Sequence, residues 1–360
     1  MKITIVGGGN IGTQFAVHCA EKGHEVTVYT SAPGLYDGTL CIVDEADKVT
    51  HEGRIKLATN DPEEAFRNAQ VCIVTFPATM MRDIAGTIYG HSSAELTIGV
   101  VPGSGGGECA FRKCIERGNV FFGIERVPAI ARLVQKGKTV RSIGYREELH
   151  VAALPRNRSG ECAQLIENIF EIPCRVIPDY LNLTMTPSNP ILHTTRLRTI
   201  FGDWHNGVAY DKVPLFYEEW DNASSELLLD CDDEVQEICR ALPMFDLQYV
   251  KSLRDHYESP TAEAMTKKIS SIPAFKGLTT PTVAGEDGRL IPDLHSRYFT
   301  ADFSYGLTIL RQIAMYANVQ TPNIDATMDW YKKIQVEKSE FRFEDFGIAD
   351  RSTFLSYYSR

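Results

Sequence analysis

The 360-residue sequence predicts an α/β fold, in which a doubly wound parallel sheet forms an N-terminal domain and an all-helical C-terminal domain follows. Three observations predict it. The chain opens with a strand, a glycine-rich turn, a helix and a second strand; strand and helix patterns then alternate; and glycines become rare from about Asn182, where helical patterns dominate. We therefore expect one domain over residues 1–181 and a second over residues 182–360.

The opening turn has Gly-x-Gly-x-x-Gly spacing. Gly7 permits the tight turn after a short β-branched strand, Gly9 lets backbone N–H groups approach a pyrophosphate, and Gly12 lets the following helix pack close to the strand. The helix over residues 10–22 and the strand over residues 25–30 complete a βαβ unit. This context predicts a Rossmann dinucleotide-binding domain with the diphosphate at the N-terminus of the helix.

The remaining cofactor contacts are expected at the ends of the next strands. Thr30 and Ser31 occupy the place where an acidic residue would select NAD(H) and a basic one NADP(H); neither type is present, and we favour NAD(H) over NADP(H). Pro77 follows a buried strand whose end should face the nicotinamide. The expected cofactor-binding residues are Gly7, Gly9, Asn10, Ile11, Gly12, Thr30, Ser31 and Pro77.

Further elements follow the same alternation. Asp61 and Pro62 have the pattern of a helix cap and first turn. Strands are expected over residues 71–75, 96–101, 140–145, 149–153 and 175–177, and a helix over residues 160–170. The glycine-rich loop over residues 102–108 is either a flexible connection or a segment that closes over the cofactor or a carboxylate.

Composition excludes several partners. A net charge of −10 argues against nucleic acid and anionic membranes, and no apolar run is long enough to span a bilayer. Nine scattered cysteines suit reduced thiols in the cytoplasm, and they lack zinc-ligand spacing, so no metal site is expected. The sequence does not determine the oligomeric state, and a homodimer is one arrangement that it allows.

Two segments of the second domain suggest chemistry. Asn189 and Pro190 resemble a helix start, and His193 lies four residues beyond Asn189, on the same side of the first turn. A histidine there is either a packing residue or an acid/base group. Asp302 is either the cap of a later helix or the partner of His193, and Arg297 is either a surface charge paired with Asp302 or the anchor of a substrate carboxylate.

On these motifs the chain resembles the opine dehydrogenases, the octopine/nopaline dehydrogenase group, over nearly its whole length. The resemblance rests on Ser188-Asn189-Pro190-x-x-x-His193, on Arg297-Tyr298-Phe299-x-x-Asp302-x-x-Tyr305-Gly306, on Thr30-Ser31-x-Pro33, on the loop Val101-Pro102-Gly103-Ser104-Gly105-Gly106 and on Thr321-Pro322-x-Ile324-Asp325.

The resemblance implies a function. The enzyme would condense an amino acid with a 2-oxo acid and reduce the imine with a nicotinamide hydride, giving an N-(carboxyalkyl)amino acid. His193 would be the acid/base, Asp302 its partner, Arg297 the carboxylate anchor and Asn189 a further catalytic contact. Ala32 stands where several relatives have a basic residue, which leaves the cofactor open. Trp204 and Tyr298 are either walls of the amino-acid pocket or core residues, and His205 is a candidate polar contact beside Trp204.

Two other functions remain open. A ketopantoate-reductase-like or glycerol-phosphate-dehydrogenase-like reductase shares the two-domain plan, but these relatives typically use a lysine as proton donor, and no lysine lies between Val140 and Lys212. A non-catalytic dinucleotide-binding sensor would not need His193, Asp302 and Arg297.

Overall fold

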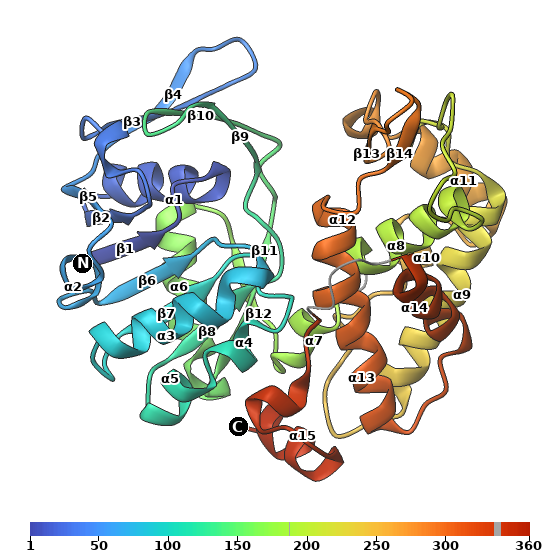
Figure 1. Cartoon of the computed structure of the whole chain (residues 1–360). Helices are drawn as coiled ribbons and strands as arrows, with labels where there is room; N and C mark the ends of the chain where they lie inside the picture. Colours follow the sequence, from blue (N-terminus) through green and yellow to red (C-terminus); the bar gives the residue numbers. More distant parts are fainter. Residues whose placement is uncertain (187, 335–339) are drawn as a thin grey trace. The chain divides into compact units, whose positions relative to one another are not determined.

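The computed structural model describes residues 1–186, 188–334 and 340–360. The chain forms two compact units (Figure 1): Met1–Thr184 together with Tyr358–Arg360, and Met185–Tyr357. The expected boundary after residue 181 therefore lies three residues before the observed one. The last three residues, expected in the helical domain, belong to the first unit.

An eight-stranded sheet forms the centre of the first unit, in the order β12-β11-β8-β7-β6-β1-β2-β5. The six strands from β8 to β5 are parallel, β11 pairs antiparallel with β8, and β12 pairs parallel with β11. This confirms the predicted α/β fold. The strands are β1 Lys2–Val6, β2 Glu25–Tyr29, β5 Leu57–Thr59, β6 Val71–Val74, β7 Thr97–Val100, β8 Phe121–Ile124, β11 Leu149–Leu154 and β12 Cys174–Val176.

Helices flank this sheet. Phe15 and Val17 of α1 share one buried apolar core with Ile166 and Phe170 of α6, because both helices have apolar residues at helical spacing. The predicted cap of α2 is confirmed, since the Asp61 side chain accepts a hydrogen bond from the Glu63 N–H at 2.9 Å. The helices are α1 Asn10–Glu21, α2 Pro62–Phe66, α3 Met81–His91, α4 Gly107–Ala110, α5 Arg112–Arg117, α6 Ser159–Phe170 and α7 Leu181–Thr184.

A second, four-stranded sheet, in the order β4-β3-β10-β9, covers α1 on the side away from the main sheet (Figure 1). Its strands are β3 Thr39–Val43, β4 Val49–Arg54, β9 Ile130–Gln135 and β10 Thr139–Ile143. The sequence predicts only β10. The strand β4 was missed because its residues are mostly polar and exposed and lack the apolar alternation of a half-buried strand.

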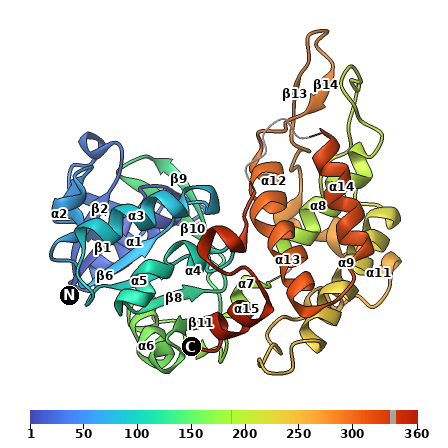
Figure 2. The ribbon, with the colours of Figure 1, turned by 60° about the horizontal axis from the view of Figure 1, so that its bottom comes forward.

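The second unit is helical, as predicted, with one addition. A β-hairpin of β13 Thr282–Ala284 and β14 Leu290–Pro292 projects from the helices (Figure 2), so the expectation of an all-helical domain is wrong at this point. A π-helical segment, Asp302–Leu307, connects α12 to α13. The helices are α8 Ser188–Phe201, α9 Asn222–Arg240, α10 Leu253–His256, α11 Ala262–Ser271, α12 Arg297–Thr300, α13 Thr308–Ala317, α14 Pro322–Ile334 and α15 Arg351–Tyr358.

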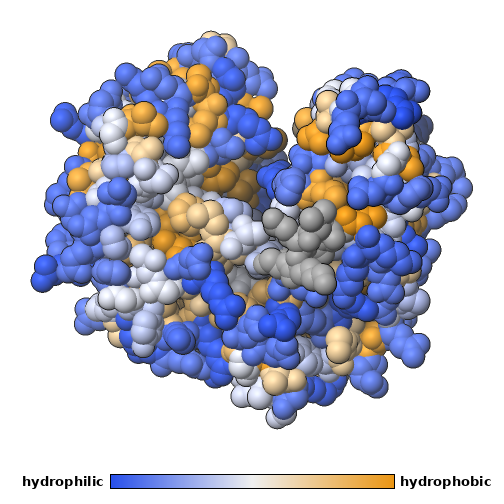
Figure 3. All heavy atoms as spheres, viewed as in Figure 1, coloured by the Kyte–Doolittle hydropathy of each residue, from blue (hydrophilic) through white to orange (hydrophobic). Residues whose placement is uncertain are grey.

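The surface and the thiols agree with the composition. Hydrophilic residues predominate on the face shown in Figure 3. Across the described ranges, no helix combines the length and the apolar character needed to cross a bilayer. All nine cysteines are free thiols, and six of them are buried.

Candidate functional site

The glycine turn has the geometry that a dinucleotide requires. Gly7 has φ +108°, and a Cβ on Gly12 would lie 1.7 Å from the Gly7 carbonyl oxygen, so neither position admits a larger residue without rearrangement. Gly9 caps α1, and no atom lies within 4 Å of the place where its Cβ would stand. The N-terminus of α1 therefore has free space above first-turn N–H groups, which fits a diphosphate.

The other expected cofactor residues contribute differently. The side-chain oxygen of Asn10 accepts a hydrogen bond from the Leu133 N–H at 2.8 Å, and Ile11 packs partly buried against the core, so each offers its backbone N–H rather than its side chain. Thr30 is buried directly after β2, whereas Ser31 and Pro77 are exposed after β2 and β6.

Tyr36, on the segment after β2, reaches the glycine turn with its hydroxyl, although the sequence does not indicate it. A Cβ on Gly8 would lie 2.0 Å from the Tyr36 hydroxyl oxygen and 3.2 Å from Oγ1 of Thr30. Burial raises the pKa of Tyr36, so its hydroxyl remains protonated beside the turn. Only the chain path after β2 brings it there, and no spacing rule in the sequence indicates it.

In the second unit, His193 lies on α8 with both ring nitrogens engaged. Nδ1 lies 2.7 Å from Oδ2 of Asp302, and Nε2 lies 2.7 Å from the hydroxyl of Tyr217. The residue is 4% exposed. With Asp302 ionised, Nδ1–H donates to the carboxylate and the Tyr217 hydroxyl donates to Nε2. The histidine therefore has the orienting carboxylate of an acid/base group.

Asp302 is not a helix cap. It is the first residue of the π-helical segment, and its side chain points to His193 instead of to the backbone N–H groups that follow it. A π-helical turn widens the helix and displaces its side chains from α-helical positions, and such turns are frequent at functional sites. The segment packs directly against α8, where Gly306 faces Pro190.

Two tyrosines complete the surroundings of His193. The Tyr298 ring lies 4.3 Å from the imidazole, centroid to centroid, and the Tyr217 ring stacks on Phe275 at 4.1 Å. Burial is the main cause that raises the pKa of Tyr217, and the neighbouring Tyr298 raises it further. Tyr217 is therefore a neutral phenol that can donate to Nε2 or accept from it. The sequence does not indicate Tyr217, because no spacing rule links it to His193.

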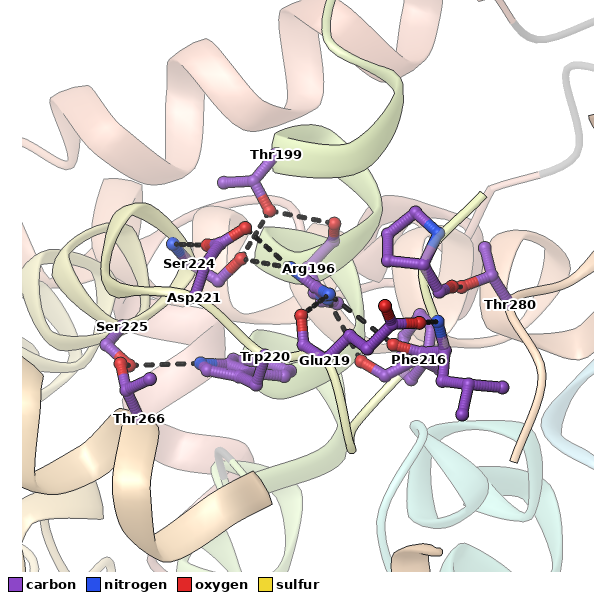
Figure 4. A network of polar contacts seen from close by, with 12 residues as sticks. Arg196, Thr199, Phe216, Glu219, Trp220, Asp221, Ser224, Ser225, Thr266 and Thr280 are labelled. Atoms are coloured by element: carbon purple, nitrogen blue, oxygen red, sulfur yellow. Dashed lines mark hydrogen bonds and ion pairs between the residues drawn. The ribbon is translucent and has the colours of Figure 1, made fainter. Parts of the chain in front are cut away.

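Arg196 fixes the segment that carries Tyr217. Its side chain is completely buried one turn beyond His193 on α8. As Figure 4 shows, it donates to the backbone carbonyl of Phe216 at 3.0 Å and to that of Glu219 at 2.5 Å. It also pairs with the Asp221 carboxylate at 3.0 Å. These bonds on both sides of Tyr217 hold the loop in one conformation, so Arg196 is a positioning residue.

Arg297 and Asn189 are less constrained. The Arg297 side chain is exposed, its guanidinium carbon lies 5.8 Å from the centre of the Tyr298 ring, and it makes no ion pair with any described carboxylate. The interpretation as a charge paired with Asp302 is therefore wrong. Asn189 is exposed and lies inside α8, which already includes Ser188, so it is not the predicted cap; residue 187 lies outside the described residues.

The glycine-rich loop after β7 ends in a buried anchor. The Glu108 carboxyl accepts hydrogen bonds from the hydroxyls of Thr184 at 2.7 Å and Tyr358 at 2.6 Å. Its complete burial raises its pKa. The loop is thus fixed at its C-terminal end, while Gly105 and Gly106, both at positive φ, form the turn before it.

Trp204 and Tyr298, the two candidate walls of the amino-acid pocket, lie in different places. Trp204 and His205 line a cavity of about 840 Å³ in the helical unit, together with Arg198, Asp329 and Trp330. Tyr298 does not line this cavity and packs on His193 instead. The structure therefore does not bring Trp204 and Tyr298 into one pocket wall.

Two family models match different parts of the chain. Residues 176–335 match the family model of the NAD/NADP octopine/nopaline dehydrogenase α-helical domain. Residues 2–102 match the model of the NAD-dependent glycerol-3-phosphate dehydrogenase N-terminus.

Among individual proteins, the chain is 29% identical to an uncharacterized protein, y4xO, of Sinorhizobium fredii, over 92% of this chain and 94% of that protein. It is 24% identical to a tauropine dehydrogenase of Arabella iricolor, over 92% and 91%. A solved octopine dehydrogenase with NADH and L-arginine superposes with a TM-score of 0.86 at 22% identity, covering 99% of this chain and 98% of that one. The same enzyme was also solved with NADH and pyruvate. The chain belongs to the octopine/nopaline dehydrogenase family, a family of NAD(P)-dependent dehydrogenases.

Proposed function

We propose that this protein is an opine dehydrogenase that joins an amino acid to a 2-oxo acid and reduces the resulting imine with NADH or NADPH. The observation that carries the proposal is the chain of contacts Asp302–His193–Tyr217, an imidazole held by a carboxylate on one nitrogen and by a neutral phenol on the other. Family membership gives the reaction class, and the family relatives were solved with an amino acid or a 2-oxo acid.

Each residue then has a role. Forming an imine requires a proton to leave the amine nitrogen and another to reach the departing hydroxyl, and His193 exchanges both through Nε2 while Asp302 stabilises the imidazolium form. Arg297 binds a substrate carboxylate through its unpaired guanidinium, and Asn189 supplies a polar contact from the first turn of α8.

The dinucleotide is assigned to the first unit. We propose that the first-turn N–H groups of Gly9, Asn10, Ile11 and Gly12 bind its diphosphate, that Thr30 and Ser31 meet the adenosine ribose, and that Pro77 lies near the nicotinamide. Gly7 shapes the turn. The bound dinucleotide would supply the hydride. We favour NAD(H) because no basic side chain follows β2, and we assign the enzyme to the cytoplasm, where its nine free thiols stay reduced.

A cofactor-oxidation screen tests the proposal. Purified protein is mixed with NADH or NADPH and with pairs of amino acids and 2-oxo acids, and the loss of absorbance of the reduced cofactor is followed. We expect oxidation only when both substrates are present. Equal rates with the 2-oxo acid alone would identify a simple ketone reductase, and no turnover with any pair would contradict the proposal.

A further inference from the structure

A cluster of metal-ligand side chains lies on α1, away from the glycine turn. His18 and Glu21 are three residues apart on the helix and therefore share one face. His51 reaches the same place from β4, a strand of the sheet that covers α1. Each of the three residues offers one ligand atom, and these atoms all lie within 4.8 Å of one another. We call these residues the α1–β4 cluster.

The contacts within the cluster are close. Nδ1 of His51 lies 2.8 Å from Oε2 of Glu21, and the rings of His18 and His51 are 4.6 Å apart, centroid to centroid. His18 is 3% exposed, and its Nε2 lies 3.0 Å from the Tyr145 hydroxyl. A histidine that ligates a metal usually has such a partner on its second nitrogen, which fixes the orientation of the ring. Glu21 and His51 remain partly accessible, so an ion can reach them.

The chemistry of the three ligands is selective. Two imidazoles and one carboxylate suit Zn²⁺ and its neighbours Ni²⁺ and Cu²⁺, whereas Mg²⁺ and Ca²⁺ prefer oxygen ligands alone. The nearby Lys22 is paired with Glu171, which offsets part of the repulsion between its charge and a cation in the cluster. A plain ion pair accounts for the bond between Glu21 and His51, but it does not require a second imidazole beside it.

We propose that the α1–β4 cluster binds one divalent transition-metal ion of the Zn²⁺ class, with His18, Glu21 and His51 as its protein ligands and water completing the coordination. Small rotations of the partly exposed Glu21 and His51 side chains bring the ligand atoms to bonding distance. The ion joins β4 to α1 and so stabilises the helix whose N-terminus we assign to the dinucleotide. The sequence alone predicts no metal site, because its cysteines lack zinc-ligand spacing and because no local pattern indicates β4, which supplies His51.

Metal titration of the full-length protein, stripped with EDTA, desalted and free of any tag, tests this proposal. Co²⁺ is followed by its visible d–d absorption, and Zn²⁺ by competition with Co²⁺ and by the shift in Tm. We expect one ion per chain and a rise in Tm of about 5 °C at a hundredfold excess of Zn²⁺ over its Kd. Glu21→Gln and His51→Gln should each weaken binding at least about tenfold.

His24→Gln is the matched control. His24 is a partly exposed histidine just beyond α1 whose Nδ1 lies 3.3 Å from the amino terminus, a second place where an ion could be held. It should change the affinity less than about twofold. The proposal is overturned if the wild-type protein takes up neither ion, if Glu21→Gln and His51→Gln both bind as the wild type does, or if binding is lost only in His24→Gln. Tm values of the metal-free variants show whether they are folded.

Discussion

The two ring nitrogens of His193 have different partners, and this difference decides what the imidazole can do. Asp302 on Nδ1 fixes the tautomer, so Nε2 is the atom that exchanges protons. In this structure the Tyr217 hydroxyl lies against Nε2. Tyr217 either remains in place during turnover and passes the proton on, or gives way to the substrate.

Tyr217→Phe separates these alternatives. The variant keeps the ring that stacks on Phe275 but removes the hydroxyl from Nε2. If Tyr217 passes the proton, kcat should fall about tenfold or more and the pH profile of kcat should change, with His193→Ala giving the lower limit. Tyr210→Phe, in the same unit, is the control and should leave kcat and its pH profile unchanged. An unaltered kcat in Tyr217→Phe would show that the hydroxyl only occupies the place of the substrate.

Arg297 is expected to act through its charge. Because its guanidinium has no carboxylate partner among the described residues, it is available to a substrate. We expect Arg297→Ala to raise the KM of one carboxylate substrate about 10- to 100-fold with a smaller effect on kcat, measured by steady-state kinetics. Arg289→Ala, which removes an exposed arginine paired with Asp287, is the control. A KM that stays constant in Arg297→Ala would exclude the assigned role.

A further residue-scale feature is the buried carboxyl of Asp232 on α9, which accepts a hydrogen bond from the Leu253 N–H at 2.7 Å. Burial raises the pKa of Asp232 to about 6. In the unfolded chain the Asp232 carboxyl ionises near pH 4. Between about pH 4 and pH 6 the folded state therefore holds more protons than the unfolded state. The free energy of unfolding falls as the pH rises through this range, by up to about 3 kcal/mol.

Asp232→Asn keeps an acceptor for Leu253 and removes this penalty. We expect the difference in Tm, variant minus wild type, to increase from pH 4.5 to pH 7 by several degrees, measured by thermal denaturation at each pH. Glu226→Gln changes an exposed carboxylate on the same helix that does not contribute to the raised pKa of Asp232, and it should show no such trend. A difference in Tm for Asp232→Asn that does not vary with pH would contradict the assignment.

At the scale of elements, the π-helical segment determines where Asp302 points. Its packing on α8 is close at Gly306, where an added Cβ would lie 2.8 Å from the Cβ and Cγ of Pro190. Pro190 lies on α8 three residues before His193, about one helical turn away. The distance between Asp302 and His193 therefore depends on the absence of a side chain at position 306.

Gly306→Ala should push the segment away from α8. We expect kcat to fall about tenfold and Tm to fall by a few degrees, because the bond between Asp302 and His193 is stretched. In Gly86→Ala, on α3, the new methyl group meets no atom within 4 Å, so that variant should keep full activity and gain stability of about 0.5–1 kcal/mol. Full activity of Gly306→Ala would mean that the segment adapts without moving Asp302.

At the scale of the whole molecule, the last three residues belong to the first unit, where Tyr358 donates to the buried carboxyl of Glu108. Tyr358→Phe removes this bond and keeps the ring. We expect a loss of about 1–3 kcal/mol and a drop in Tm of a few degrees, measured by calorimetry. The exposed Tyr89 on α3 is the control, since Tyr89→Phe should have little effect. An unchanged Tm in Tyr358→Phe would show that the bond does not contribute to stability.

The features that could be predicted from the sequence are those that short stretches of residues determine. Gly7, Gly9 and Gly12 have their roles through spacing alone, and the apolar pattern of α1 and β6 needs no distant partner. Loops bring Tyr217 and Tyr36 to their places, and the polar strand β4 brings His51. No local pattern in the sequence indicates the path of these segments. For Asp302, 109 positions from His193, the sequence left two interpretations open, a helix cap or the partner of the histidine, and the resemblance to a family favoured the second.

The return of the C-terminus makes the first unit discontinuous along the chain, and this affects how the protein can be divided. A gene fragment that stops after Thr184 would include all eight strands of the main sheet but would lack the phenol that donates to Glu108. An isolated cofactor domain would therefore need Tyr358–Arg360 supplied through a short linker, or a hydrophobic replacement for Glu108, to fold as it does in the intact chain.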